Sequence, residues 1–148
     1  MRDEIEKTIH SKNTLGGILE IVALNVPVGL GSFMQWDKRL EAKLAIAIMS
    51  VQAIKGVEVG DAFENAKRLG TQAHDAITLS GQRSNVERLS NRAGGTEGGI
   101  SNGQPIIIRA AMKPIATTLT PQQTVDLALG ENAPLRTYEF TQNRCHIP

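Results

Sequence analysis

The sequence predicts a mixed α/β chain with a single domain over residues 1–148, in which helices and strands pack in layers. A length of 148 residues suits one domain with a sizeable core and is too short for two comfortable ones. One long segment has apolar residues at helical spacing, whereas other segments are continuous runs of β-branched residues. The two patterns alternate along the chain, and no internal repeat accompanies them.

Residues 36–56 are the clearest predicted helix. Their apolar side chains recur at helical spacing, and alanines surround that stripe. Asp37 can cap the start of the helix and Gly56 can close its end, so we expect a central, well-buried helix. Residues 15–31 are nearly all apolar and rich in β-branched side chains, which favours a strand covered on both faces.

The other predicted elements are shorter. They are, in chain order, a helix at 2–12, a strand at 56–63, a helix at 64–70, a strand at 106–112, a β-like piece at 124–127 and a further candidate strand at 136–148. Residues 71–91 show no sustained period and many polar side chains, so we expect a long loop there.

Composition and charge exclude several classes of function. Sixteen basic residues against fifteen acidic ones leave a net charge of +1, which argues against a nucleic-acid or membrane surface. The apolar runs are far shorter than the ~20 residues that span a bilayer, and the charged N-terminus does not resemble a signal peptide. Cys145 is the single cysteine, so no internal disulfide can form. We therefore expect a cytoplasmic protein with no nucleic-acid partner and no membrane association.

No catalytic motif is visible among the titratable side chains. His10, His74 and His146 lie in unrelated contexts, and no GxSxG elbow is present. No spacing of cysteine and histidine suits a metal, so we expect no metal site. Cys145 has no organised base beside it in the sequence, and His74 could touch a ligand only if its loop closes.

The segment NRAGGTEGGISNGQP, residues 91–105, holds five glycines within ten positions. Ile100 stands where a P-loop requires lysine, no GxGxxG is present, and Glu97 would face phosphate in a KH-type loop. A flexible linker is a poor explanation because the glycines run directly into a strong strand. Two interpretations stay open: the glycines let a ligand approach the backbone closely, or they form a purely structural cluster of turns.

This segment and three others resemble the chorismate synthase family. NRAGGTEGGISNGQPIIIRAAMKP is similar to the family's NxAGGxxGGISNGxPI followed by KP. Upstream, LGGILEIVALNVPVGLG resembles GGxVExxxxxVPxGLG, and WDKRLEAKLAIAIMSVQAIKGVEVGDAF resembles DxxLxAxLAxAxMSIxAVKGVEIGDGF. TVDLALGE also matches. The resemblance covers nearly the whole chain, with the motifs in the family's order.

The resemblance implies a fold, an activity and partners. The fold is an α+β type, a β-α-β sandwich with helices packed against antiparallel sheet, of which this chain is a part, assembled as a homotetramer. The activity is that of a phosphate lyase in the shikimate pathway of aromatic amino acid biosynthesis. Its substrate, 5-enolpyruvylshikimate 3-phosphate, is converted to chorismate by 1,4-anti elimination of phosphate. The cofactor is reduced FMN, which is not consumed overall, and NADP is also associated with the family.

The resemblance also implies which positions contact FMN. These are two residues at the end of the long helix, one glycine of the glycine segment and five residues after the strong strand: Gln52, Ala53, Gly98, Lys113, Pro114, Ile115, Ala116 and Thr117. Lys113 can place a cation near the phosphate or the negative charge of the reduced flavin. Gly98, having no side chain, lets the ring approach.

The chain departs from the family in its catalytic residues. The family's two catalytic histidines lie in motifs N-terminal to anything present here, and none of the three histidines matches them, so the catalytic residues stay unassigned. Near the C-terminus, YEFTQNRCHIP replaces the family's RSDxCxVP. Cys145 and Pro148 fit, whereas Phe140, Thr141 and Gln142 stand near the expected Arg, Ser and Asp. We expect a C-terminal portion of a chorismate synthase without turnover by itself, or alternatively a catalytically inactive FMN-binding or oligomerisation fragment.

Overall fold

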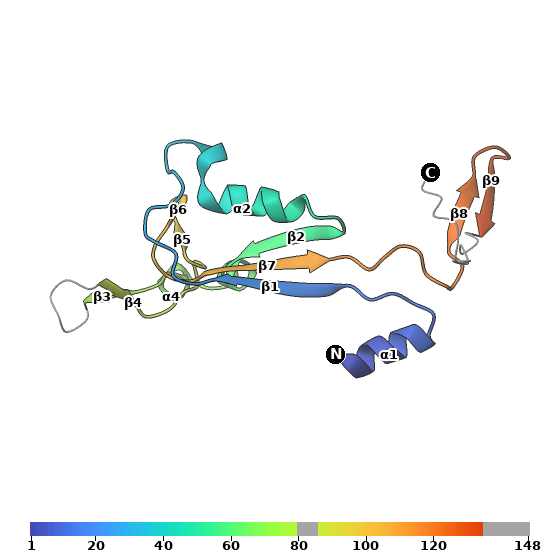
Figure 1. The fold of residues 1–148 in the computed structure, drawn as a ribbon, viewed down its shortest axis with the longest axis horizontal. Helices are drawn as coiled ribbons and strands as arrows, with labels where there is room; N and C mark the ends of the chain where they lie inside the picture. The colour runs from blue at the N-terminus through green and yellow to red at the C-terminus, as the bar shows by residue number, and fades with distance from the viewer. Residues whose placement is uncertain (80–85, 135–148) are drawn as a thin grey trace. The chain divides into compact units, whose positions relative to one another are not determined.

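The structure is a computed structural model that describes residues 1–79 and 86–134 (Figure 1). The chain divides into two compact units, each considered by itself below. The larger unit is Gly17–Met112, and the smaller one combines Met1–Gly16 with Lys113–Pro148.

A three-stranded antiparallel sheet forms the centre of the larger unit. Its order is β1 (Gly17–Ala23), β7 (Ile106–Met112), β2 (Ile54–Val59), with β7 in the middle. β7 has the bounds predicted from its continuous apolar run. Helices together with antiparallel strands confirm the predicted α+β class.

The buried core of this unit lies on one face of the sheet. Alternate residues of β7, namely Ile106, Ile108 and Ala110, are buried because successive side chains of a strand point to opposite faces. Ile54 of β2 is buried as well. Helix α2 (Leu40–Met49) packs against β2, as Figure 1 shows. The core is therefore a small aliphatic layer between this helix and the sheet.

The expected helix at 36–56 is shorter than predicted and is not well buried. A 3-10 turn, η1 (Trp36–Lys38), precedes α2, and Arg39 rather than Asp37 occupies the N-cap, without a side-chain hydrogen bond. The chain leaves the helix after Met49, and Gly56 pairs with Ala111 inside β2. One stripe of α2, formed by Leu40, Leu44 and Ile48, is half-buried, whereas Ile46 and Met49 are exposed, so no residue of the helix is fully buried.

The expected strand at 15–31 is also shorter than predicted. β1 ends at Ala23, and all seven of its residues are exposed rather than covered on both faces. Asn25 adopts a positive φ of 57°, and Pro27 follows, so pairing with β7 cannot continue. The chain instead runs on as a loop whose Leu30 binds the glycine segment.

The predicted long loop at 71–91 contains regular structure. After α3 (Ala62–Asn65), the chain forms α4 (Gly70–Ala73) and an antiparallel pair, β3 (Ile77–Leu79) with β4 (Val86–Arg88). These elements are only three or four residues long. A periodic pattern needs a longer window to be visible, so the prediction was wrong at this point.

The smaller unit has one helix and one hairpin among its described residues. Helix α1 (Arg2–His10) confirms the predicted N-terminal helix. β8 (Gln123–Asp126) pairs with β9 (Glu131–Pro134), where the sequence predicted only a β-like piece. The candidate strand at 136–148 lies outside the described residues.

The described part of the chain has neither a membrane-spanning helix nor a cluster of metal-ligating side chains. No helix there has the length and apolar character needed to cross a membrane. Within the same residues, no group of three or more His, Cys, Asp or Glu side chains could hold a metal ion.

Candidate functional site

The glycine segment folds into a tight hairpin. β5 (Thr96–Glu97) pairs with β6 (Ile100–Ser101), and Gly98 and Gly99 form the two-residue turn between them. Their φ angles are 60° and 95°. Positive φ at both central residues is typical of a type I′ turn, which suits the twist of a hairpin and strongly favours glycine.

Three of the glycines are required by close approach of backbone to backbone. A Cβ added to Gly94 would lie 2.3 Å from the nitrogen of Gly60, and one added to Gly95 would lie 2.5 Å from the carbonyl oxygen of Pro105. A Cβ on Gly99 would lie 2.5 Å from the oxygen of Ser32. For these positions the structural cluster of turns is the correct interpretation.

Gly98 is different from its neighbours. It is exposed, and a Cβ added there would meet no atom within 4 Å. Its position in the turn explains the preference for glycine through φ, and the space above it is open to a ligand. Gly98 therefore remains compatible with close ligand approach.

Side-chain hydrogen bonds fix the loop that leads into the hairpin. Asn91 accepts a hydrogen bond from the Gly95 amide at 2.8 Å and donates one to the Pro105 oxygen at 2.8 Å. The Asp75 carboxylate accepts from the Arg92 and Ala93 amides, each at 2.9 Å. The loop is thus tied both to β7's start and to the α4–β3 connection.

Hydrogen bonds to Asp75 shift its pKa. Burial of the Asp75 carboxyl raises the pKa, but the bonds from the Ser90 hydroxyl and from the Ala93 and Arg92 amides lower it, as does the charge of Arg92. The net result is a pKa below the ordinary value. The carboxylate is therefore held in its charged form by the loop that it supports.

A second segment of the chain packs against the hairpin through Ser101. The Ser101 hydroxyl donates to the Pro27 oxygen at 2.6 Å and accepts from the Leu30 amide at 2.9 Å, and Ser101 is fully buried. Backbone bonds join Gly29 to Ser101, and Gly31 forms a bridge with Ile100. The segments VPVGLG and GGISNG, far apart in sequence, thus form one structural layer.

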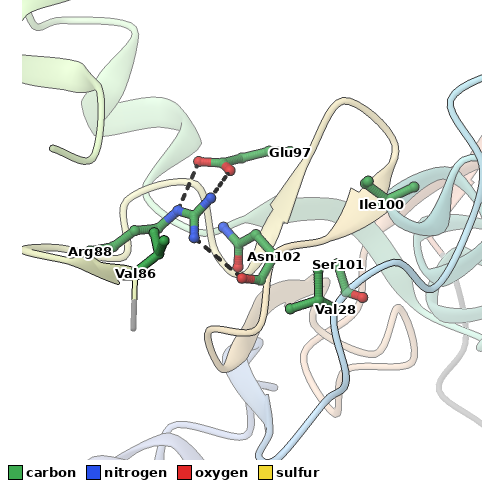
Figure 2. Close-up of a pocket in the computed structure, with 7 residues that line it drawn as sticks. All are labelled: Val28, Val86, Arg88, Glu97, Ile100, Ser101 and Asn102. Carbon is green, nitrogen blue, oxygen red and sulfur yellow. Dashed lines mark hydrogen bonds and ion pairs between the residues drawn. The ribbon is translucent and has the colours of Figure 1, made fainter. Parts of the chain in front are cut away.

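A cavity of about 310 Å³ lies beside the hairpin (Figure 2). Arg88 binds Glu97 through Nε at 3.3 Å and Nη2 at 2.5 Å, and its Nη1 donates to the Asn102 oxygen at 3.3 Å. The side-chain nitrogen Nδ2 of Asn102 is buried and has no hydrogen-bond partner among the described residues. The lining residues are Val28, Val86, Arg88, Glu97, Ile100, Ser101 and Asn102.

The structure divides the predicted flavin contacts between the two units. Gln52 and Ala53 lie in the turn between α2 and β2, and Ala53 has a φ of 70°. With Gly98 they belong to the larger unit, whereas Lys113, Pro114, Ile115, Ala116 and Thr117 belong to the smaller unit and are all exposed.

Within the larger unit, the two groups of predicted contacts are far apart. Ile54, next to Ala53, pairs with Met112 at the last position of β7. The hairpin that carries Gly98 packs at the other end of β7, where Gly94 binds Ile107 (Figure 1). A strand of seven residues separates them by about 20 Å. One copy of the chain does not bring Ala53 and Gly98 together.

Sequence reasoning missed part of this site. Arg88 lies in the predicted loop, and neither it nor Asn102 was expected to take part in a cluster. No local pattern marks either residue, because the contact joins β4 to a hairpin nine residues away. His74 is exposed at the C-cap of α4 and His10 is exposed at the end of α1. His146, Cys145 and the altered segment Phe140–Gln142 lie outside the described residues.

The fold and this site define an α+β protein with a glycine hairpin packed on a backbone loop. The sequence model of the chorismate synthase family matches residues 1–143, and the chain belongs to that family. A solved structure titled "Crystal Structure of Chorismate Synthase" aligns with a TM-score of 0.73 and 53% identity, covering 78% of this chain and 34% of the other.

Curated relatives agree with this assignment. The chorismate synthase of Trichlorobacter lovleyi is 47% identical over 154 residues, which cover 100% of this chain and 39% of the relative. Those of Corynebacterium jeikeium and Mycobacterium ulcerans are 53% and 54% identical and cover 90% and 88% of this chain. In both cases 31% of the relative is covered. The chain thus spans between three tenths and two fifths of these relatives' length.

Proposed function

We propose that the chain supplies the flavin-binding part of a chorismate synthase. The proposed reaction converts 5-enolpyruvylshikimate 3-phosphate to chorismate and phosphate with reduced FMN, as a lyase of the shikimate pathway. The observation that carries the proposal is the match to the family over residues 1–143. Gly98 supports it, because that residue alone of the hairpin's glycines 94, 95, 98 and 99 has open space above its Cα.

The residues present are suited to FMN. Lys113 is exposed and offers a cation for the phosphate or for the charge of the reduced ring. The following four residues, 114–117, are exposed too and present backbone groups and a hydroxyl. Reduced FMN would supply electron density to the reacting substrate. The chain's own part is to bind and orient the flavin through Gln52, Ala53, Gly98 and the segment 113–117.

The proposal extends to the assembly. Gln52 and Ala53 are separated from Gly98 by the length of β7, which favours a flavin site that takes the two groups from different copies of the chain. A homotetramer, as implied by the resemblance, allows this arrangement. A single domain over residues 1–148, a cytoplasmic location and a role for NADP belong to the same proposal.

The alternative function is a catalytically inactive FMN-binding or oligomerisation fragment. The observation in its favour is that none of His10, His74 and His146 matches the family's catalytic histidines. In addition, Phe140, Thr141 and Gln142 stand near the positions where the family has Arg, Ser and Asp. The 148-residue chain alone is accordingly predicted to bind flavin without turnover.

An anaerobic experiment tests both functions. The purified chain is titrated with reduced FMN and then assayed for chorismate formation from 5-enolpyruvylshikimate 3-phosphate. Flavin binding without turnover supports the inactive alternative, whereas turnover contradicts it. The absence of any flavin binding contradicts both functions that involve FMN.

A matched pair of variants connects the binding to the hairpin. Gly98→Ala places a methyl group in the open space of the predicted contact and is expected to weaken FMN binding. Gly130→Ala is the control, because Gly130 has a similar φ of 68° and equally open surroundings but is no predicted contact. Equal loss of affinity in both variants would contradict a flavin contact at Gly98.

A further inference from the structure

We propose that Arg88 is a positioning residue that neutralises Glu97 and so permits an anionic flavin to bind at Gly98. The inference rests on the proposed function. It concerns the cluster in Figure 2, where the guanidinium of Arg88 lies between Glu97 and Asn102. Neither Arg88 nor Glu97 is among the predicted flavin contacts.

Arg88 and Glu97 form a bidentate ion pair. Nε and Nη2 of the guanidinium both donate to the carboxylate, at 3.3 and 2.5 Å, one to each oxygen. This fork-to-fork geometry fixes orientation as well as charge. Nη1 donates to the backbone oxygen of Asn102 at 3.3 Å, so Arg88 links Glu97 of β5 to the residue that follows β6.

The two partners differ in exposure. The side chain of Arg88 is 14% exposed, whereas that of Glu97 is 41% exposed. Arg88 is therefore withdrawn below the surface, and the carboxylate is the group nearer to solvent. Removing the arginine would leave a bare negative charge at the rim of the hairpin.

That charge would stand directly beside the proposed flavin contact. Glu97 is the residue before Gly98 in the chain and pairs with Ile100 across the turn. An anion at Gly98 would be repelled by an unpaired carboxylate at this distance, and the repulsion is screened little where solvent is displaced. Pairing with Arg88 cancels most of the field that the anion would meet.

The family motif does not require this acidic residue. In NxAGGxxGGISNGxPI, position 97 is one of the four unspecified residues, and Arg88 stands before the motif begins. The chain therefore carries an acidic side chain in its glycine hairpin together with the cation that offsets it. We infer that the pair works as a unit.

Charge-removing variants test the inference in the whole chain. Arg88→Met keeps the length of the side chain and removes its charge, and Glu97→Gln removes the opposing charge. Arg88→Met is expected to weaken FMN binding about tenfold, a modest charge effect. Glu97→Gln is expected to change the FMN affinity less than about threefold. The double variant should also bind FMN within about threefold of the wild type, because neither charge is left unpaired.

A purely structural role for Arg88 gives a different pattern. If Arg88 only supported the hairpin, the double variant would bind FMN as weakly as Arg88→Met or more weakly, and this result would overturn the proposal. Thermal unfolding of all four proteins shows whether each remains folded. Arg88→Lys restores the charge without the fork and should recover most of the affinity.

Comparing oxidised with reduced flavin gives a measurement that a purely structural role of Arg88 would not affect. In Arg88→Met, reduced FMN, which carries an additional negative charge, should lose more affinity than oxidised FMN. A loss that is ten times larger for the reduced form lowers the two-electron potential of the bound flavin by about 30 mV. Equal losses for the two forms would overturn the proposed effect on the flavin ring.

Inorganic phosphate tests the charge balance without flavin. Amide shifts of Gly98 and Gly99 are followed by NMR as phosphate is added. The response should be present in the wild-type chain, lost in Arg88→Met and regained in the double variant. If the chain binds no FMN, the proposed function fails while this result still supports the neutralisation. No response in the wild type, or the same response in all variants, overturns it.

Discussion

Gly60 and Gly94 lie in direct backbone contact. A Cβ added to Gly94 would be 2.3 Å from the nitrogen of Gly60, and one added to Gly60 would be 2.5 Å from the nitrogen of Gly94. The Gly60 amide also donates to the Ile107 oxygen at 2.8 Å, so the contact anchors the glycine segment to β7. No side chain fits between these segments.

We predict that Gly94→Ala strongly destabilises the chain, whereas Gly98→Ala does so mildly. At Gly94 the methyl group meets backbone at a φ of 63°, and overpacking together with the left-handed conformation costs about 2–5 kcal/mol. At Gly98 only the φ of 60° is unfavourable, at about 1 kcal/mol. Urea unfolding of both variants measures the difference. Equal losses of unfolding free energy in the two variants would contradict the backbone contact between Gly60 and Gly94.

We expect the Asp75 carboxylate to make the free energy of unfolding depend on pH. Its pKa in the folded chain lies below the ordinary 3.8, because hydrogen bonds from Ser90, Ala93 and Arg92 outweigh the opposing effect of burial. A lowered folded pKa contributes stability above about pH 4 that is lost as the pH falls through the folded pKa. Stability should therefore decline on acidification in this window.

Asp75→Asn tests this dependence. The variant keeps an acceptor oxygen but cannot accept both backbone amides, so we expect a loss of about 1–3 kcal/mol at pH 7. The loss should shrink as the pH falls through the folded pKa of Asp75, because the wild-type side chain then becomes neutral as well. Ser90→Ala removes one hydrogen bond and leaves the carboxylate, so its effect should be smaller. If the destabilisation by Asp75→Asn stayed constant from pH 7 down to the acid unfolding of the wild type, the assignment would be refuted.

Ala53→Gly should stabilise the chain. Ala53 has a φ of 70°, a left-handed conformation that costs an L-residue about 1–2 kcal/mol and costs glycine little. Glycine loses more entropy on folding, so the net gain should be about 0.5–1 kcal/mol. Ala47→Gly is the matched control, because Ala47 lies inside α2, where glycine costs about 1 kcal/mol. In thermal unfolding, Ala53→Gly should raise the melting temperature and Ala47→Gly should lower it. A lower melting temperature for both variants would contradict backbone strain at Ala53.

Arg109 holds two carboxylates of neighbouring strands on one face of the sheet. It lies opposite Glu20 of β1 and Glu58 of β2, at 2.9 and 3.3 Å, and the hydrogen bonds that it donates to these carboxylates raise its pKa. Arg109→Gln should lower the melting temperature, because it leaves two like charges on either side of β7. The loss should be larger at low salt. Adding Glu58→Gln to Arg109→Gln should recover part of the lost melting temperature. If it recovers none, repulsion between the carboxylates is not the cause of the loss.

The sequence predicted elements better than contacts. β7 and α1 follow from continuous or periodic local patterns, and the structure confirms both. β3 and β4 are three residues long, too short for a period to be recognised. Burial of α2 and β1 was overestimated, because an apolar pattern shows what can be buried and not what is there to cover it.

The glycine segment shows the same limit for the site. From the residues alone, close ligand approach and a cluster of turns could not be separated. The contact of Gly94 with Gly60 joins segments that are 34 residues apart, so no local pattern could reveal it. The resemblance singled out Gly98, and the open space there agrees with it, although the flavin contact itself is still a prediction. Arg88 was missed because its partners lie on other strands.

Lys113→Gln should weaken FMN binding about tenfold, since one charge-assisted hydrogen bond contributes about 1.5–3 kcal/mol in a binding site. Lys7→Gln, on exposed α1, is the control and should have no effect on FMN binding.

Riboflavin, which lacks the phosphate, separates the two roles proposed for Lys113. If the cation pairs with the phosphate, the variant should bind riboflavin as well as the wild type does, and high salt should diminish its defect with FMN. If the cation pairs with the reduced ring, the defect should persist with reduced riboflavin and disappear with the oxidised form. Unchanged affinity for all four ligands would remove Lys113 from the flavin site.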